Sequence, residues 1–198
     1  IVPIVASIIV GIISGVITGL IISKLKVPAF LAGLGLQLII YGGNLLFMKK
    51  APNNSQPLAG FKESFTKFGT GSVAGVNYLI IVAFVVMIAV YIILNMTTLG
   101  KNIYATGGNR EAAKVAGINV FKIDMFVYIL SGALAALAGC MLAARTGSAN
   151  ATYAEGYEMD AIASCIIGGA SFTGGIGNVP GAFLGVIIFS VISYGLTF

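Results

Sequence analysis

Long stretches without a charged residue most restrict how this chain can fold. A charged side chain in hydrocarbon is costly, and about 20 apolar helical residues, at ~1.5 Å each, cross the roughly 30 Å hydrocarbon core of a bilayer. These stretches predict an all-α, polytopic membrane protein in which several helices form a bundle. The charge-free stretches are Ile1–Ser23, Val27–Met48, Phe68–Gly100, Met125–Ala144 and Ala161–Phe198.

The composition agrees with a lipid environment. Hydrophobic residues make up 58% of the chain and charged residues 9%, and the mean hydropathy is +1.03. Soluble domains carry about 25% charged residues. The net charge is +5, but the basic residues lie between the apolar stretches, where the loops that flank membrane helices normally carry them. We therefore expect the lipid bilayer, and no nucleic acid, around this chain.

The first four stretches each predict one spanning helix, and in the third stretch the helix should cover residues 77–94. The last stretch differs, because the cluster GGASFTGGIGNVPG (Gly168–Gly181) should interrupt a helix through its glycines and Pro180. The piece before the cluster has about 10 residues, or ~15 Å as a helix, which is half a membrane. Residues 159–181 therefore predict a half-helix followed by a glycine-rich break.

The glycine-rich break has two interpretations. Irregular backbone at membrane depth is tolerated where it lines a wet cavity or is buried in protein. The break is thus a candidate for a translocation pathway, and the alternative is a packing site without contact to substrate. The sequence leaves both open. The candidate pathway residues are Gly168, Gly169, Ser171, Thr173, Gly174 and Gly175.

Other glycines recur at intervals of four residues. Small residues at this spacing form a helix face on which another helix can approach closely. Both series predict close helix packing and say nothing about substrate. One series is Gly11, Gly15 and Gly19, and the other is Gly177, Gly181 and Gly185.

The chain lacks the residues that several kinds of chemistry require. The chain has no histidine, which removes serine–histidine catalysis and histidine-ligated metal sites. Cys140 and Cys165 are 25 residues apart in apolar surroundings and are interpreted as small buried hydrophobes. No span carries an ionisable residue at mid-depth, which argues against proton coupling but leaves a sodium-coupled carrier open. We expect no enzyme activity, metal or cofactor in this chain.

One short segment, GGNREAAKVAGINVFKID (residues 107–124), holds five charged residues. Asn109 is a good N-cap, Glu111 suits the first turn, Lys114 falls near the end, and Gly117 is placed as the stop. The pattern predicts a helix of about two turns. Its charged face would meet a partner outside the membrane, and its other face, Ala112, Val115 and Ala116, would lie on the spanning helices. The alternative is an ordinary solvated loop helix.

Two longer blocks carry a family resemblance. LGKNIYATGGNREAAKVAGINVFKID and GYEMDAIASCIIGGASFTGGIGNVPGAFLGVIIFSVISYGLTF resemble the permease subunit of bacterial monosaccharide ABC importers, a family with the type II importer fold. PLAGFKESFTKFGTG (Pro57–Gly71) and SVISYGLTF are more similar to galactose and methyl-galactoside permeases than to ribose permeases. Members of the family are longer and have more spans, so residues 1–198 are expected to be one permease domain that is incomplete at both ends.

The resemblance implies partners and a position in the cell. It implies a multi-pass protein of the bacterial cytoplasmic membrane, two permease subunits that form the pore, separate cytoplasmic ABC ATPases and an extracytoplasmic sugar-binding protein. Consistent with a separate ATPase, the chain has no GxxxxGK[ST] phosphate loop. The family's cytoplasmic coupling helix, in the loop 101–124, matches Gly107, Gly108, Asn109, Arg110, Glu111, Ala112, Lys114 and Gly117.

The resemblance also orients the chain. With residues 107–117 in the cytoplasm, residues 49–75 and 145–160 face outward. Glu155, Glu158 and Asp160 then form an outward acidic group that could meet a binding protein, or Asp160 could simply cap the half-helix. The implied function is ATP-driven import of a monosaccharide. The alternatives are import of another small polar solute and ion-coupled secondary transport.

Overall fold

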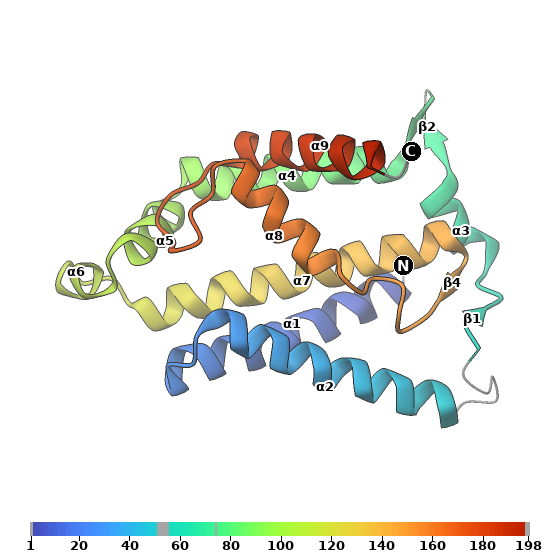
Figure 1. The fold of residues 1–198 in the computed structure, drawn as a ribbon, viewed down its shortest axis with the longest axis horizontal. Helices are drawn as coiled ribbons and strands as arrows, with labels where there is room; N and C mark the ends of the chain where they lie inside the picture. Colours follow the sequence, from blue (N-terminus) through green and yellow to red (C-terminus); the bar gives the residue numbers. More distant parts are fainter. Residues whose placement is uncertain (1, 51–55, 74, 197–198) are drawn as a thin grey trace. The chain divides into compact units, whose positions relative to one another are not determined.

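A computed structural model of the chain describes residues 2–50, 56–73 and 75–196 (Figure 1). Within the predicted outward loop, residues 51–55 and 74 lie outside the described residues, as do residues 197–198 of the last stretch. The elements are α1 (Val2–Leu25), α2 (Ala29–Lys50), β1 (Leu58–Ala59), α3 (Glu63–Thr70), β2 (Ser72–Val73), β3 (Val76–Asn77), α4 (Tyr78–Met96), α5 (Thr98–Gly108), α6 (Arg110–Val115), α7 (Val120–Thr146), β4 (Ser148–Ala149), α8 (Tyr157–Ile167) and α9 (Val179–Gly195).

The four predicted spanning helices are confirmed as α1, α2, α4 and α7. Each is long and apolar enough to cross a membrane. The third runs from Tyr78 to Met96, close to the predicted 77–94. The fourth begins at Val120, five residues before the charge-free stretch, so Asp124 belongs to its early turns. The Ser23 hydroxyl donates a 3.3 Å hydrogen bond to the carboxylate of the buried Asp124, and both residues belong to the same compact unit of the chain.

The half-helix and the break are also confirmed. α8 has 11 residues, the segment 168–178 carries no helix, and α9 follows with 17 residues. Two local assignments were wrong. The N-cap of α8 is Gly156, and Asp160 lies within the first turns. Pro180 does not break a helix, because it occupies the start of α9, where its fixed φ suits the first turn and no N–H partner is needed.

The chain divides into two compact units, which are described separately. Unit 1 comprises Ile1–Ala83 and Asp124–Tyr153, and unit 2 comprises Phe84–Ile123 and Ala154–Phe198.

The glycine series of α1 forms a close-packing face, as predicted, and in unit 1 its partner is α7. Gly11 contacts the backbone of Gly132, Gly15 contacts Tyr128, and Gly19 contacts the Met125 side chain. Partner numbers fall along α7 as they rise along α1, so the two helices are antiparallel. A Cβ atom at Gly15 would lie 2.9 Å from the Ile129 Cα, which shows how little room the contact leaves.

At the C-terminal end of α7, short segments of two loops contact each other. β1 pairs antiparallel with β4, with Leu58 opposite Ala149. In α3, Gly69 lies against the backbone of Ala144 and Arg145. These contacts bring the segment before α4 and the segment after α7 to the same end of α7, in agreement with the side predicted for both. The sequence analysis did not predict α3, although Phe61, Phe65 and Phe68 recur at helical spacing.

Unit 2 is built on the α8–α9 pair. At the C-terminal end of α8, Ser164 and Gly168 contact α9 through backbone atoms. Their partners on α9 are Gly181 and Gly185. Gly177 does not belong to this face, because it lies before α9 begins, with a positive φ of 157 degrees. From α4, the Phe84 ring lies 5.5 Å from that of Phe183 on α9. One cysteine assignment was wrong: in unit 2 Cys165 is exposed, whereas Cys140 of unit 1 is buried as predicted.

Candidate functional site

The charged segment folds as the short helix α6, and its two ends explain why. The Asn109 side chain accepts hydrogen bonds of 3.0 Å from the N–H groups of Glu111 and Ala112. At the other end, Gly117 adopts φ +81, and the N–H of Ile118 bonds the Ala113 carbonyl at 3.0 Å. This is the Schellman stop that a glycine in the left-handed region allows. The predicted cap, length and stop are all confirmed.

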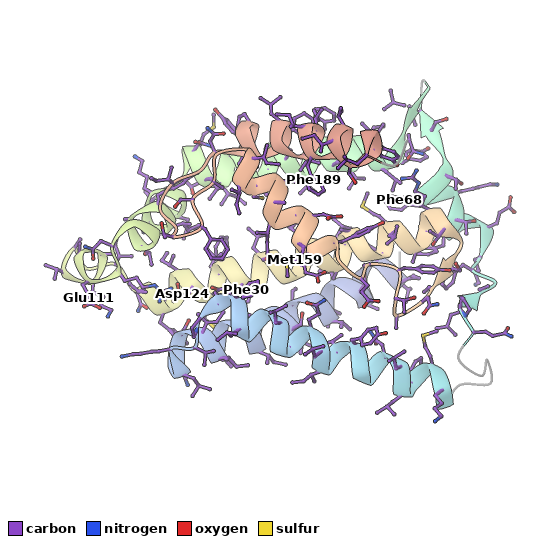
Figure 2. All side chains as sticks on the ribbon, viewed as in Figure 1. Phe30, Phe68, Glu111, Asp124, Met159 and Phe189 are labelled. Carbon is purple, nitrogen blue, oxygen red and sulfur yellow. The ribbon has the colours of Figure 1, made fainter. Side chains whose placement is uncertain are left out.

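The charged side chains of α6 are exposed. The Lys114 ammonium lies 2.7 Å from the Glu111 carboxylate, and the two side chains remain 55% and 81% exposed. Figure 2 shows Glu111 on α6 with the side chains of this helix extending outward from it. An exposed ion pair of this kind contributes only about 0–1 kcal/mol to stability, so the face is available for other contacts.

The inner face of α6 was predicted wrongly. Only Ala113 is buried, at 3% exposure, whereas Val115 is 91% exposed and Ala112 and Ala116 are exposed as well. The helix has six residues, close to the predicted two turns, and one of its alanines reaches the rest of the chain. The exposed surface of α6 therefore combines charges with one aliphatic side chain, which is a composition suited to a protein partner.

A second helix, α5, directly precedes α6 in the chain and was not predicted from the sequence. A single residue, Thr97, separates α4 from α5, and its hydroxyl accepts a hydrogen bond from the Gly100 N–H at 3.3 Å. α5 ends at Gly108, so Asn109 closes α5 and opens α6. The segment 101–124 is therefore helical over most of its length.

The break between α8 and α9 is a compact turn. The Ser171 and Thr173 hydroxyls share a 2.8 Å hydrogen bond, and the Ser171 N–H donates to the Ile176 carbonyl at 2.9 Å. Gly169, Gly174 and Gly175 have positive φ angles of 86, 94 and 76 degrees. L-residues with a Cβ rarely adopt this region, so the sequence needs glycine here.

Unit 2 brings the two predicted sites into direct contact. A Cβ atom on Gly107 would lie 2.5 Å from the Gly175 nitrogen, and one on Gly175 would lie 2.6 Å from the Gly108 Cα. One turn earlier on α5, the Tyr104 hydroxyl donates a 2.9 Å hydrogen bond to the Gly177 carbonyl. Tyr104 was not among the predicted site residues, and nothing near it in the sequence signals a partner 73 residues away.

These contacts bear on the two interpretations of the break. Gly168, Gly174 and Gly175 each pack against another backbone segment, so a packing role is observed for them. A groove of about 330 Å³ runs beside α8 and the break, and Ser171 is the predicted pathway residue that lines it. Its other lining side chains, including Ile162, Ile166 and Phe172, are apolar and suit a sugar poorly. The pathway role of this segment stays a prediction.

The predicted acidic group lies before and within the first turns of α8. Glu155 and Asp160 are exposed and Glu158 is half-buried. The Asp160 carbonyl accepts a 2.7 Å hydrogen bond from the buried Ser164 hydroxyl, and Asp160 itself is exposed. Carboxylates near a helix N-terminus are also favoured by the helix dipole. The geometry is compatible with docking and with a purely local role.

The chain is similar to several known proteins. The family described as branched-chain amino acid transport system / permease component matches residues 1–198. The galactose/methyl galactoside import permease protein MglC of Haemophilus influenzae is 43% identical over 90% of this chain, as is that of Escherichia coli. The ribose import permease protein RbsC of Escherichia coli is 40% identical over 89% of it. The chain covers 54% of each of these relatives. No solved structure matches the chain.

The resemblance seen in the two sequence blocks is thus confirmed over nearly the whole chain. The matching relatives are bacterial import permeases, and four helices here are long and apolar enough to span a bilayer. Both findings indicate a multi-pass protein of the bacterial cytoplasmic membrane. The chain belongs to the branched-chain amino acid transport system / permease component family.

Proposed function

We propose that the protein containing this chain is the membrane-spanning subunit of an ATP-driven importer for a monosaccharide of the galactose, methyl galactoside or ribose type. The observation that carries the proposal is the 43% identity to galactose/methyl galactoside import permeases over 90% of the chain. The capped helix α6, with its exposed charges and Val115, supports it, because a separate motor needs a docking point of this kind.

In this proposal, a cytoplasmic ABC ATPase binds α6. Asn109 fixes the start of the helix, while Arg110, Glu111 and Lys114 offer both signs of charge to the partner. Opposite charges at a rim determine the register of docking more than its affinity. Val115, 91% exposed, is the apolar side chain that the ATPase would cover.

Two further partners belong to the proposal. A soluble sugar-binding protein would dock on the opposite side, where Glu155, Glu158 and Asp160 supply negative charge for basic residues. A second copy of the permease would complete the pore. Glu155→Lys together with Asp160→Lys should raise the concentration of binding protein needed to stimulate the ATPase. An unchanged concentration dependence would contradict the docking role of this acidic group.

The test of function is uptake into lipid vesicles. The full-length protein is reconstituted with candidate ATPase and binding-protein subunits, and labelled galactose, methyl galactoside and ribose are supplied with ATP. Uptake should require ATP, the ATPase and the binding protein. Uptake with the ATPase omitted would contradict the importer proposal and favour an ion-coupled carrier.

The docking role of α6 is tested by charge reversal. Arg110→Glu combined with Glu111→Arg should abolish co-purification of the ATPase and leave the membrane helices folded. The matched control is Glu63→Lys with Lys67→Glu on α3, a second short helix whose exposed ion pair spans 3.0 Å. The control should retain the ATPase. Equal ATPase retention in both variants would contradict docking on α6.

One observation favours a second substrate class. The family that matches the chain is described by branched-chain amino acid transport, whereas the similar curated proteins are named for sugars. A branched-chain amino acid such as leucine is therefore the competitor to include. Leucine uptake that exceeds sugar uptake under the same conditions would replace the sugar in the proposal without changing the transport mechanism.

A further inference from the structure

The contact between α5 and the glycine-rich break is made by backbone atoms. The break sits on Gly107 and Gly108, the last two residues of α5, immediately before α6 begins. A Cβ atom on Gly174 would lie 3.0 Å from the Gly107 carbonyl oxygen. Backbone therefore meets backbone, and no flexible side chain lies between these residues to absorb a displacement.

One side chain adds a hydrogen bond to this backbone contact. Tyr104 lies one turn before Gly108 on α5, and its hydroxyl donates to the Gly177 carbonyl at 2.9 Å. Gly177 immediately precedes Asn178, whose side chain caps α9 through the Gly181 N–H at 2.5 Å. The Tyr104 hydrogen bond thus connects the base of α6 to the start of α9.

A neighbouring residue shows that this arrangement leaves one group unsatisfied. Thr106 is 3% exposed, and among the described residues its hydroxyl has no hydrogen-bond partner. Buried hydroxyls are normally paired, and an unpaired one disfavours the arrangement that contains it. An arrangement of the α5–break contact that paired this hydroxyl would relieve that penalty, and a moving part requires two arrangements of similar free energy.

We propose that Tyr104 is a positioning residue that holds the break against the base of α6, so that movement of α6 is passed to α8 and α9. The inference rests on the proposed function, in which an ATPase moves α6. It adds the physical link by which that movement reaches the half-helix. Tyr104 keeps the link engaged, and the unpaired Thr106 hydroxyl keeps it close to a second arrangement.

The first experiment measures coupling in the full-length protein, reconstituted with its ATPase and binding protein. Tyr104→Phe keeps the ring and removes the hydroxyl. Sugar transported per ATP hydrolysed should fall about fivefold, the factor that one hydrogen bond of typical strength represents, while stimulated ATP hydrolysis persists. Tyr91→Phe is the matched control, since it removes a hydroxyl from α4 that bonds no described residue. An unchanged ratio in Tyr104→Phe, or equal loss of uptake and hydrolysis, would overturn the positioning role.

The second experiment needs no transport. Amide hydrogen exchange at residues 174–177 should be about fivefold faster in Tyr104→Phe, because the break is released more often. Thr106→Val should change the exchange rate in the opposite direction, since it removes the unpaired hydroxyl and keeps the shape. Exchange that is unchanged or moves in the same direction in both variants would overturn the inference. Uptake by the unmodified protein without ATPase would instead contradict the proposed function. The hydrogen-exchange result would still test the Tyr104 contact, because it does not depend on transport.

Discussion

Two glycine contacts, one in each unit, place the backbones of distant segments against each other by different means. In unit 1, Gly11, Gly15 and Gly19 lie on one face of α1 and admit α7. In unit 2, Gly107 and Gly108 at the end of α5 receive Gly174 and Gly175 of the break. The first contact joins two regular helices, and the second joins a helix end to a turn whose glycines have φ angles of 94 and 76 degrees.

The difference explains what each contact is suited to do. Regular helices that interlock over three turns have one register, and a shift would bring every glycine against a larger residue. A helix end against a left-handed turn makes few contacts, one of them through the Tyr104 hydroxyl. The α1–α7 contact is therefore suited to hold unit 1 together, and the α5–break contact to change.

The largest effect should come from filling the α1–α7 contact. Gly15→Leu would place a side chain where even a Cβ atom lies 2.9 Å from the Ile129 Cα. Overpacking of this severity should lower the free energy of unfolding by ~3 kcal/mol or more, and thermal unfolding of the full-length protein in detergent measures it. Gly35→Leu on α2 is the control, because nothing described lies within 4 Å of its Cβ position. Equal melting temperatures would contradict the α1–α7 contact.

Gly175→Ala should have the next largest effect, because it combines two costs. At φ +76 the left-handed backbone costs an L-residue about 1–2 kcal/mol, and the added Cβ would lie 2.6 Å from the Gly108 Cα. Gly60→Ala separates the two costs, since Gly60 has φ +84 and open space around its Cβ position. Coupled uptake should fall in Gly175→Ala and stay near normal in Gly60→Ala. If both variants behave alike, strain alone explains the result and the contact does not.

Gly107→Ala should have a smaller effect that isolates the steric part of the α5–break contact. Alanine stabilises a helix by up to ~1 kcal/mol over glycine, which partly offsets the clash 2.5 Å from the Gly175 nitrogen. Gly108→Ala adds the same atom where nothing described lies within 4 Å. Sugar uptake should therefore fall further in Gly107→Ala than in Gly108→Ala. The reverse order would contradict the contact.

The smallest effect should come from the cap of α6, a local feature that supports the α5–break region from outside. Asn109→Ala removes the acceptor for the Glu111 and Ala112 N–H groups and should cost about 1 kcal/mol of helix stability. ATPase co-purification should weaken by a few fold at the same protein concentration. Asn109→Ser keeps an oxygen at this position and should restore binding. Failure of serine to restore it would assign Asn109 a direct contact with the ATPase instead.

Prediction from sequence succeeded where the signal was local. The absence of charge located four spanning helices, and Asn109 with Gly117 marked both ends of α6. It failed where burial depended on distant segments. Ala113, and not Ala112, became the buried alanine of α6, and Cys165 stayed exposed on α8. α5 was not predicted, because Lys101 ended the charge-free stretch that was used to locate helices. A helix near a membrane surface nevertheless tolerates a charge at its outer turns.

Sequence was enough to predict the membrane setting, the approximate positions of the four spans, the glycine stripe of α1 and the family, because hydropathy, spacing and motif are all properties of neighbouring residues. Only the folded chain shows that Gly107 meets Gly175 and that Tyr104 bonds Gly177, residues 68 and 73 positions apart along the chain. Such pairing depends on how α8 and α9 fold back within unit 2. Left-handed glycines permit that path, but no periodicity in the sequence specifies where it leads.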